Sequence, residues 1–470
     1  MTIDPKLAGV AAALALIGLS GCSFYNYQHD TADYDGDDYS LRIVQADDFG
    51  TFWDIDKPRN VLREVEKLAN DQNVLVVVFI HGWHHNAAAD DMNLLDFRQT
   101  LKDLGDVLRT KERRALRGKL TTSEDLKILG IYIGWRGRSL PGVLDYATMW
   151  WRKSAAERVG DGDVSEFIER LDRTYLRRNA LVMKDVSGVQ KHALMGLVTI
   201  GHSFGGQVLL RSIARALEYS LVQRAPCAAE LLDPSARAAD RVDERVSVDS
   251  LGDLNILVNP ATEAYQFARI DALYRQLNYP DSQTPQLVVF SADNDIPRKS
   301  FFPIARVLTR PFRTPFRSDF DDYQATLWGR ALGEVARQQT HILRLAAEGS
   351  QDSFSNATYE GAGQDLLLHF DFSMTSTFAG VTLEPVANPG TGERSSIPNS
   401  PVIVATSVSN IIDGHNGIFG EEFRKFLIGY VSFIEGKRIL LRAEQHRELR
   451  PHRSAEVAAK GEIEPVCGAE

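Results

Sequence analysis

The sequence predicts an α/β protein built on a doubly wound, mostly parallel sheet. Short runs rich in β-branched residues alternate with stretches that show the three- and four-residue spacing of helices. Each run is apolar at consecutive positions, as is typical of strands buried on both faces of a parallel sheet. The predicted strands are residues 74–80, 128–133, 197–200, 254–258, 287–291 and 402–406.

Helical stretches follow most of these strands, for example residues 93–108, 207–219 and 421–433. Two segments interrupt the alternation: residues 223–250, rich in Ala, Asp and Arg, and the long stretch 299–399 before the last strand. A stretch of that length needs secondary structure of its own. We expect a helix at 325–347, a hairpin at 365–372, and an insertion that covers the functional site.

The composition is that of a globular protein. Of the 470 residues, 44% are hydrophobic and 25% are charged, which excludes a disordered or collagen-like chain. The formal net charge is −10, whereas a general nucleic-acid binder needs a basic face to displace counterions from phosphates. No nucleic-acid partner is therefore expected.

The first residues resemble a bacterial lipoprotein signal peptide. An apolar run at 7–19 follows Lys6, and it is shorter than the ~20 residues that cross a bilayer but has the length of a signal-peptide core. The ending Leu19-Ser20-Gly21-Cys22 resembles the motif that is cut just before a lipidated cysteine. We expect a signal peptide at 1–21 and a lipid anchor on Cys22; a plain secretory peptide and an uncleaved anchor are the alternatives.

Lipidation would place the protein in the bacterial cell envelope, held to a membrane through Cys22. Ser23 rather than Asp follows the cysteine, which favours the outer membrane, facing the periplasm, over the inner membrane. Residues 22–40 are polar and rich in Asp and Tyr, and are predicted to form a tether with little structure. The main domain is then 41–440, followed by a polar tail at 441–470.

Two cysteines remain after the signal segment, Cys227 and Cys467. The envelope permits disulfides, so a bond between them is one alternative and two free thiols are the other.

The segment Gly201-His202-Ser203-Phe204-Gly205 matches the G-x-S-x-G pattern between a predicted strand and a predicted helix, the context of a nucleophile elbow. The flanking glycines suit a turn that strains the serine backbone and packs strand closely on helix. Ser203 is thus the candidate nucleophile. The amide of Phe204, at the start of the helix, is a candidate oxyanion donor.

A second oxyanion donor is expected in the loop that follows strand 74–80. There His81-Gly82-Trp83 is similar to the His-Gly-X loop of lipases and esterases, which assigns the amide of Trp83 to the oxyanion hole and a structural role to His81. A metal site formed by His81, His84 and His85 is the alternative, although no Asp or Cys joins them at ligand spacing.

His415 is the candidate base. It lies on a loop just beyond strand 402–406, where the order Ser, acid, His places the histidine. We expect His341 inside a helix and His369 inside a strand. Neither is then on a loop, where the base is expected.

The acid that orients His415 is expected after strand 287–291. Asp295 is the first choice and Asp293 the second, because the lipases and esterases that the motifs above resemble often have two residues of turn before the acid. Glu263, after the preceding strand, is a third candidate. Asp413 is too close to His415 in sequence.

Trp135 and Arg136 follow strand 128–133 at the sheet edge where open α/β folds bind ligands, so they are candidates for the substrate pocket or for loop packing. Trp150 and Trp151 suit either a hydrophobic lid or a helix core.

These motifs together resemble the α/β-hydrolase superfamily, and in particular bacterial members that carry His-Gly-Trp-x-His-Asn, Trp-Arg-Gly and Gly-His-Ser-x-Gly-Gly. The resemblance covers about residues 74–433. It implies a serine hydrolase that acts on carboxylic esters, of small molecules or lipids, without metal or cofactor. Acyl transfer, thioester or amide hydrolysis, and a catalytically inactive binding module tethered to the envelope are the alternatives.

Overall fold

The computed structural model describes residues 27–121, 123–139, 148–184, 193–224, 245–301, 322–359, 363–387, 395–408 and 410–448. Cys22, Cys227, Cys467 and most of the 223–250 segment lie outside these residues, as does the tail from residue 449 onward.

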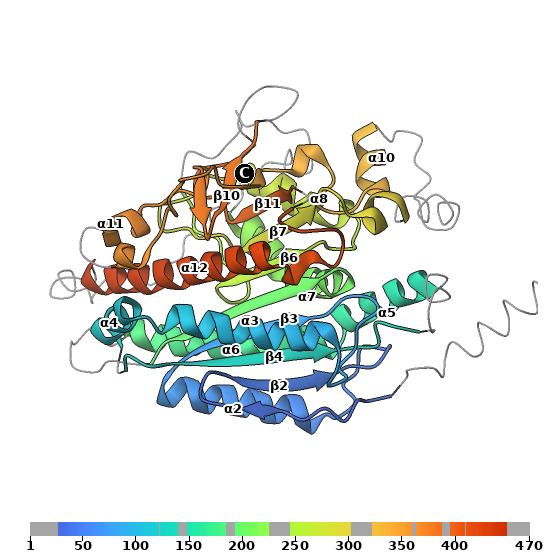
Figure 1. Cartoon of the computed structure of the whole chain (residues 1–470), viewed down its shortest axis with the longest axis horizontal. Helices are drawn as coiled ribbons and strands as arrows, with labels where there is room; N and C mark the ends of the chain where they lie inside the picture. The colour runs from blue at the N-terminus through green and yellow to red at the C-terminus, as the bar shows by residue number, and fades with distance from the viewer. Residues whose placement is uncertain are drawn as a thin grey trace, which may run out of the picture.

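One open sheet organises the described chain (Figure 1), in the order β1-β2-β4-β3-β5-β6-β7-β11-β8-β10-β9. All neighbours from β2 to β8 pair in parallel, and antiparallel pairs occur only at the two edges of the described sheet. The strands are β1 Tyr34–Asp35, β2 Ser40–Gln45, β3 Asn73–Ile80, β4 Leu126–Gly134, β5 Met195–His202, β6 Leu254–Val258, β7 Leu287–Ala292, β8 His341–Leu345, β9 Ser376–Phe378, β10 Val381–Pro385 and β11 Val402–Ser407.

Helices cover both faces of the sheet (Figure 1). The core on one face includes side chains of α3, α4, α11 and α12, and the core on the other includes side chains of α2, α5, α6, α7 and α8. The α-helices are α2 Asp56–Asp71, α3 Met92–Leu108, α4 Lys111–Leu120, α5 Met149–Asp161, α6 Asp163–Lys184, α7 Phe204–Arg224, α8 Tyr265–Tyr274, α10 Asp322–Gly329, α11 Gly363–Leu368 and α12 Glu421–Glu448. Short turns of other helix types are Pro297–Phe301, Ala336–Gln338, Asn356–Tyr359 and Gly417–Phe419.

The predicted α/β class and parallel sheet are confirmed. Each of the six predicted strands is present, and all eight residues of β3 are buried, as expected for a strand with helices on both sides. The three predicted helices correspond to α3, α7 and α12. Helix α12 continues to Glu448, so the segment predicted as tail begins inside a helix.

The predictions for the long insertion were wrong in detail. Residues 325–347 form α10, a short helical turn and strand β8 rather than one helix, and 365–372 contains α11 rather than a hairpin. Short apolar runs fit either a buried helix or a strand, and pairing with β11 and β10 settles β8 as a strand. The described part of the insertion therefore extends the sheet by β8, β10 and β9 instead of forming only a cover.

The predicted tether is structured from Tyr27 onward, contrary to expectation. His29 and Gln45 exchange two hydrogen bonds of 2.8 and 2.7 Å, and the hydroxyl of Thr31 donates to the carbonyl of Ala87 at 2.5 Å. Strand β1 then pairs with β2. Polar groups of this segment thus form hydrogen bonds with the main domain, and these bonds cannot be predicted from the composition of the segment.

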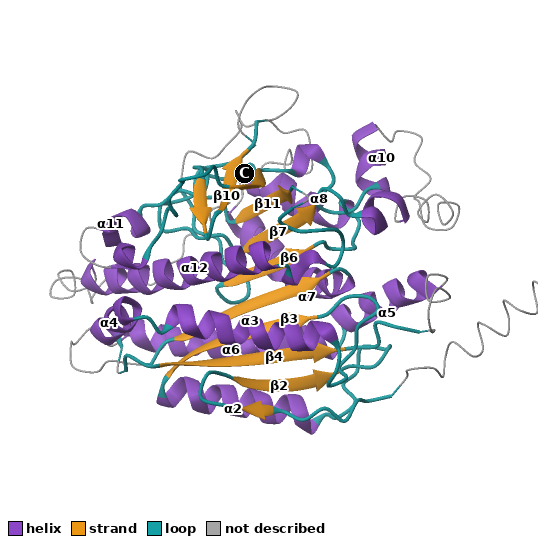
Figure 2. Ribbon diagram, viewed as in Figure 1, coloured by secondary structure: helices purple, strands orange, loops and turns teal. Residues whose placement is uncertain are grey.

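Loops gather at the edge of the sheet where β2, β4 and the other parallel strands end (Figure 2). This carboxyl-end edge carries the residues discussed below. In the described part of the chain, no helix has the length and apolar character needed to cross a membrane.

Candidate active site

Ser203 occupies the sharp turn between β5 and α7, because β5 ends at His202 and α7 begins at Phe204. Its backbone has φ of +55°, in the left-handed region that costs a non-glycine residue conformational energy. Three hydrogen bonds hold this backbone: the Ser203 amide donates to Val258, and the Ser203 carbonyl accepts from Gln207 and Ala261. The turn is fixed on both sides by neighbouring elements.

Glycines around Ser203 are required by close contacts. A Cβ on Gly205 would lie 2.1 Å from the carbonyl oxygen of Ile80, and one on Gly201 would lie 2.6 Å from that of Gly205. A Cβ on Gly82 would lie 2.8 Å from Cβ of Ser203. The loop after β3 therefore runs directly against the serine.

Ser203, His415 and Asp295 form a continuous hydrogen-bonded chain. The Ser203 hydroxyl donates to Nε2 of His415 at 2.7 Å, and Nδ1–H of His415 donates to Oδ2 of Asp295 at 2.7 Å. These roles follow from the acceptor-only character of an ionised carboxylate. Ser203 and Asp295 are fully or almost fully buried.

The two alternative acids have partners of their own. Asp293 lies at the end of β7, where its amide donates to Ser407 and its carbonyl accepts from Lys299. Glu263 is buried elsewhere and pairs with the ammonium of Lys153 at 3.1 Å. Of the three sequence candidates, the structure brings only Asp295 to the histidine.

Asp295 is held as a carboxylate in a dry environment. Burial by itself disfavours the charge, but the hydrogen bond from His415 and the nearby Arg298 outweigh it, and the pKa of Asp295 is lowered. The Arg298 guanidinium lies 3.7 Å from Oδ2, and the Arg298 amide donates to Oδ1 at 3.0 Å. Both carboxylate oxygens are thus engaged.

The loop that carries His415 is anchored through its own backbone. The side-chain Nδ2 of Asn259 donates to the carbonyls of Gly414 and His415 at 3.1 and 2.9 Å, and Nε2–H of His202 donates to the His415 carbonyl at 2.8 Å. Burial lowers the pKa of His202 to about 3, so this ring is neutral at ordinary pH. Asn259 also adopts φ of +46° at the end of β6.

Sequence reasoning missed Asn259, His202 and Arg298 as parts of this site. His202 lies inside the quoted motif, and Asn259 follows a predicted strand end just before Pro260, so each had a weak positional signal. Arg298 had none, because its proximity to Asp295 depends on the turn Pro297–Phe301.

His81 has the structural position expected of it. Nδ1–H donates to the Gly82 carbonyl at 2.9 Å, Nε2 accepts from the Trp135 amide at 2.9 Å, and its ring stacks on Trp135 with an interplanar angle of 5°. Burial lowers the pKa of His81 to about 4. The ring joins the loop after β3 to the end of β4.

The two residues assigned to the oxyanion hole flank Ser203. Phe204 is the next residue in the chain and is the first residue of α7. Trp83 directly follows Gly82, where an added Cβ would lie 2.8 Å from the Cβ of Ser203. The rings of Trp83 and Phe204 are 6.3 Å apart.

The histidines of this loop make separate contacts. Nδ1 of His85 lies 3.1 Å from Asp91, whose carboxylate also caps α3, whereas His84 stacks on Trp83. Among the residues that the structure describes, no group of three or more His, Cys, Asp or Glu side chains is placed to share a metal ion.

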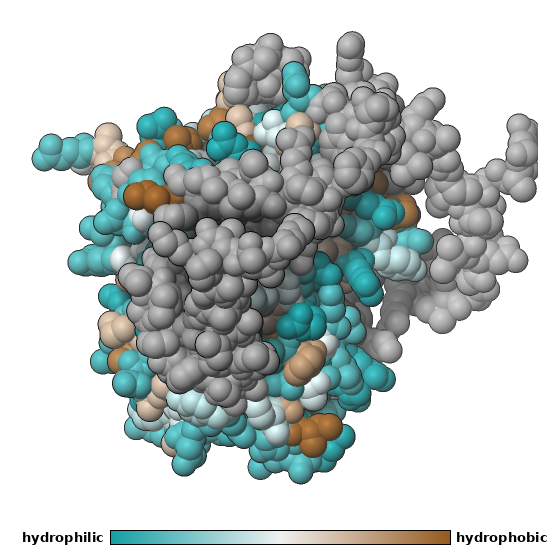
Figure 3. Space-filling model, turned by 90° about the vertical axis from the view of Figure 1, so that its right-hand side faces the viewer, coloured by the Kyte–Doolittle hydropathy of each residue, from teal (hydrophilic) through white to brown (hydrophobic). Residues whose placement is uncertain are grey.

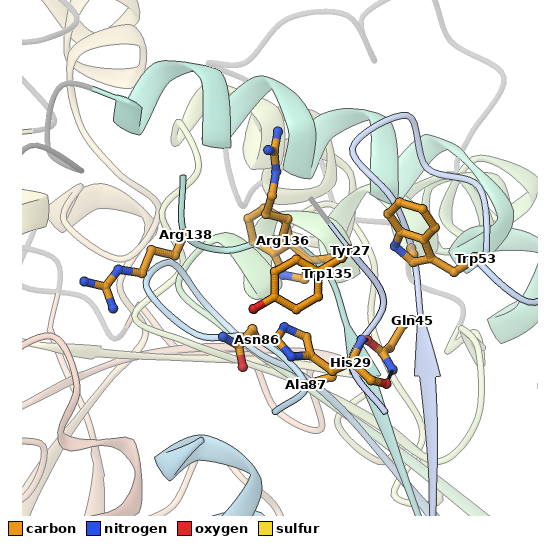
Figure 4. Close-up of a pocket in the computed structure, with 10 residues that line it drawn as sticks. Tyr27, His29, Gln45, Trp53, Asn86, Ala87, Trp135, Arg136 and Arg138 are labelled. Atoms are coloured by element: carbon orange, nitrogen blue, oxygen red, sulfur yellow. Dashed lines mark hydrogen bonds between the residues drawn. The ribbon is translucent and has the colours of Figure 1, made fainter. Parts of the chain in front are cut away.

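Trp135 and Arg136 lie at the carboxyl-end edge, directly after β4. Trp135 is buried behind His81, and Arg136 pairs with the buried Asp48. Both line a hollow with Tyr27 (Figure 4). Trp151 on α5 is half exposed, and the side chain of Trp150 lies outside the described part.

No family model, curated protein or solved structure matches this chain.

Proposed function

We propose that this protein is a serine hydrolase of the α/β-hydrolase type that cleaves carboxylic esters at the bacterial cell envelope, to which a lipid on Cys22 anchors it. The observation that carries the proposal is the chain of two 2.7 Å hydrogen bonds from Ser203 through His415 to Asp295. The strained elbow at Ser203 and the chain order Ser, Asp, His support the same assignment.

The geometry suits acyl transfer through a covalent intermediate. His415 Nε2 takes the hydroxyl proton as Ser203 Oγ forms a bond to the acyl carbonyl carbon, and Asp295 stabilises the imidazolium. The intermediate then expels the alcohol, which receives the proton from His415. Water attacks the acyl-enzyme in the same way and releases the carboxylic acid.

The amides of Trp83 and Phe204 are the proposed donors to the oxyanion. They flank the nucleophile from two different elements, as in an oxyanion hole built from the residue after the nucleophile and a loop after an earlier strand. Loss of one such donor typically slows the reaction ~100- to 1,000-fold.

Hydrolysis of p-nitrophenyl esters by the protein purified from membranes tests the proposal. We expect turnover that Ser203→Ala reduces by at least ~10³-fold while Ser212→Ala, a buried serine on α7, retains it. Turnover unaffected by Ser203→Ala would contradict the assignment. Formation of a new ester in the presence of added alcohol would identify transfer rather than hydrolysis.

A further inference from the structure

Four large hydrophobic side chains are exposed close to the start of the described chain. The exposed fraction is 54% for Tyr27, 76% for Phe49, 40% for Trp53 and 56% for Ile55. We call these residues the N-terminal hydrophobic patch. Single exposed hydrophobic side chains are ordinary, but a local group of them marks a contact surface.

The fold holds the patch outward on ordered backbone. Phe49 is at the tip of a tight turn in which Asp47 Oδ1 accepts from the amides of Phe49 and Thr51 at 2.8 and 2.9 Å. The Trp53 amide then donates to the Gln45 carbonyl at 3.0 Å, which closes the turn onto the end of β2. The aromatic rings are therefore presented by a fixed turn rather than by a freely moving loop.

The patch is on the same edge of the sheet as Ser203. Both the turn after β2 and the elbow after β5 follow the carboxyl ends of parallel strands. The strand order β2-β4-β3-β5 separates them by three strand spacings, about 14 Å along the edge. In Figure 3, which views this edge, hydrophobic side chains are visible at the lower end, where β2 and α2 lie in Figure 1.

The position of Tyr27 relates the patch to the proposed lipid anchor. Tyr27 and Trp53 line one hollow (Figure 4), and the segment that follows Tyr27 is bound to the domain through His29 and Gln45. Cys22 is five residues before Tyr27 in the sequence. Five residues reach at most about 18 Å even when fully extended, so a lipid on Cys22 requires Tyr27, and the hollow that it lines with Trp53, to lie within about that distance of the bilayer.

We propose that the N-terminal hydrophobic patch rests on the membrane surface and that Ser203 acts on acyl esters held in that membrane. This inference rests on the proposed lipidation of Cys22 and, for the substrate, on the proposed hydrolase activity. Tryptophan and tyrosine favour the headgroup level of a bilayer. Acidic Asp54 and Asp56 flank Ile55, so the patch lies at that level rather than deep in the hydrocarbon.

Site-specific photocrosslinking in intact cells tests the docking independently of activity. The full-length protein carries p-benzoylphenylalanine in place of Phe49, and, as the matched control, in place of Tyr219. Tyr219 is 68% exposed but lies fifteen residues beyond Phe204, the first residue of α7, about 22 Å from the elbow along the helix axis. We expect a phospholipid adduct at position 49, at least fivefold more abundant than at position 219.

Three results would overturn the docking: no excess of lipid adduct at position 49, an adduct with another protein there instead, or a mature N-terminus whose mass shows no lipid on Cys22.

The substrate is tested separately with the Phe49→Ser/Trp53→Ser protein in liposomes. We expect hydrolysis of a bilayer-resident ester to fall at least tenfold while that of a soluble short-chain ester is unchanged; Tyr219→Ser should change neither. Equal rates on the bilayer ester would contradict the substrate class, whereas lipid adducts without any esterase activity would refute only the hydrolase.

Discussion

Asp295 lies between His415 on one side and Arg298 on the other. The hydrogen bond to His415 fixes the ring so that Nε2 faces Ser203, and the buried guanidinium of Arg298 favours the ionised carboxylate. Because the pKa of Asp295 is lowered, this carboxylate remains charged throughout the neutral range. An amide at this position would lose the charge and would favour the wrong tautomer of His415.

Asp295→Asn should therefore reduce kcat by about 10⁴-fold with little change in KM, the loss typical of such a substitution in a serine triad. Asp293→Asn is the matched control and should stay within threefold of the parent, since the hydrogen bonds of Asp293 to Ser407 and Lys299 are made by its backbone. Steady-state ester hydrolysis measures both. The opposite ranking of the two variants would assign the acid to Asp293.

At the scale of elements, the elbow depends on the close approach of β3, β5 and α7. Gly205 on α7 packs against the carbonyl oxygens of Ile80 and His81, where a Cβ would come within 2.1 and 2.5 Å. These are backbone atoms of a central strand and its loop, so they cannot move aside as the end of a flexible side chain does. The sequence requires glycine here for packing.

Gly205→Ala should destabilise the protein by at least ~2 kcal/mol, the scale of overpacking in a tight interior. Gly329→Ala is the control, because outside its own helix and chain neighbours no atom of the described residues lies within 4 Å of its added Cβ. Thermal unfolding of the two variants tests this difference. An unchanged melting temperature for Gly205→Ala would contradict this prediction, because it would show that the loop after β3 can move to accommodate the added methyl group.

The strands buried on both faces of the sheet were predictable, because burial on both sides requires an uninterrupted apolar run. Ser203 and His415 could be predicted from the G-x-S-x-G motif and from the chain order Ser, acid, His. The later part of α12 was not predictable from the sequence. Its Arg438 and Arg442 form ion pairs with Asp253, which is far from them in the sequence. The choice of Asp295 depended on the register of one turn. Asn259 and Arg298 act through contacts that exist only once β6, β7 and the His415 loop have met.

In the part of the chain that the structure describes, three fully buried histidines, His81, His202 and His341, are neutral when folded. Burial lowers the pKa to about 4 in His81, about 3 in His202 and about 4 in His341. Unfolding returns each ring to a pKa near 6.5, so below that pH the unfolded state binds more protons than the folded state. Stability is then complete above about pH 6.5 and is lost as the pH falls toward 4.

Urea unfolding at pH 7 and pH 5 should show a loss of roughly 2 kcal/mol for each of these histidines. His341→Gln removes one of them far from Ser203, and its loss between the two pH values should be smaller than that of the parent by about 2 kcal/mol. An identical loss in variant and parent would show that His341 is protonated in the folded protein.

Covalent labelling shows whether Ser203 is the activated nucleophile. A fluorophosphonate probe reacts with a serine only when a neighbouring base activates its hydroxyl and the site admits the probe. We expect one adduct, mapped by peptide mass spectrometry to Ser203, lost in Ser203→Ala and strongly slowed in His415→Ala. Folded protein that remains unlabelled, or an adduct on another serine, would contradict it.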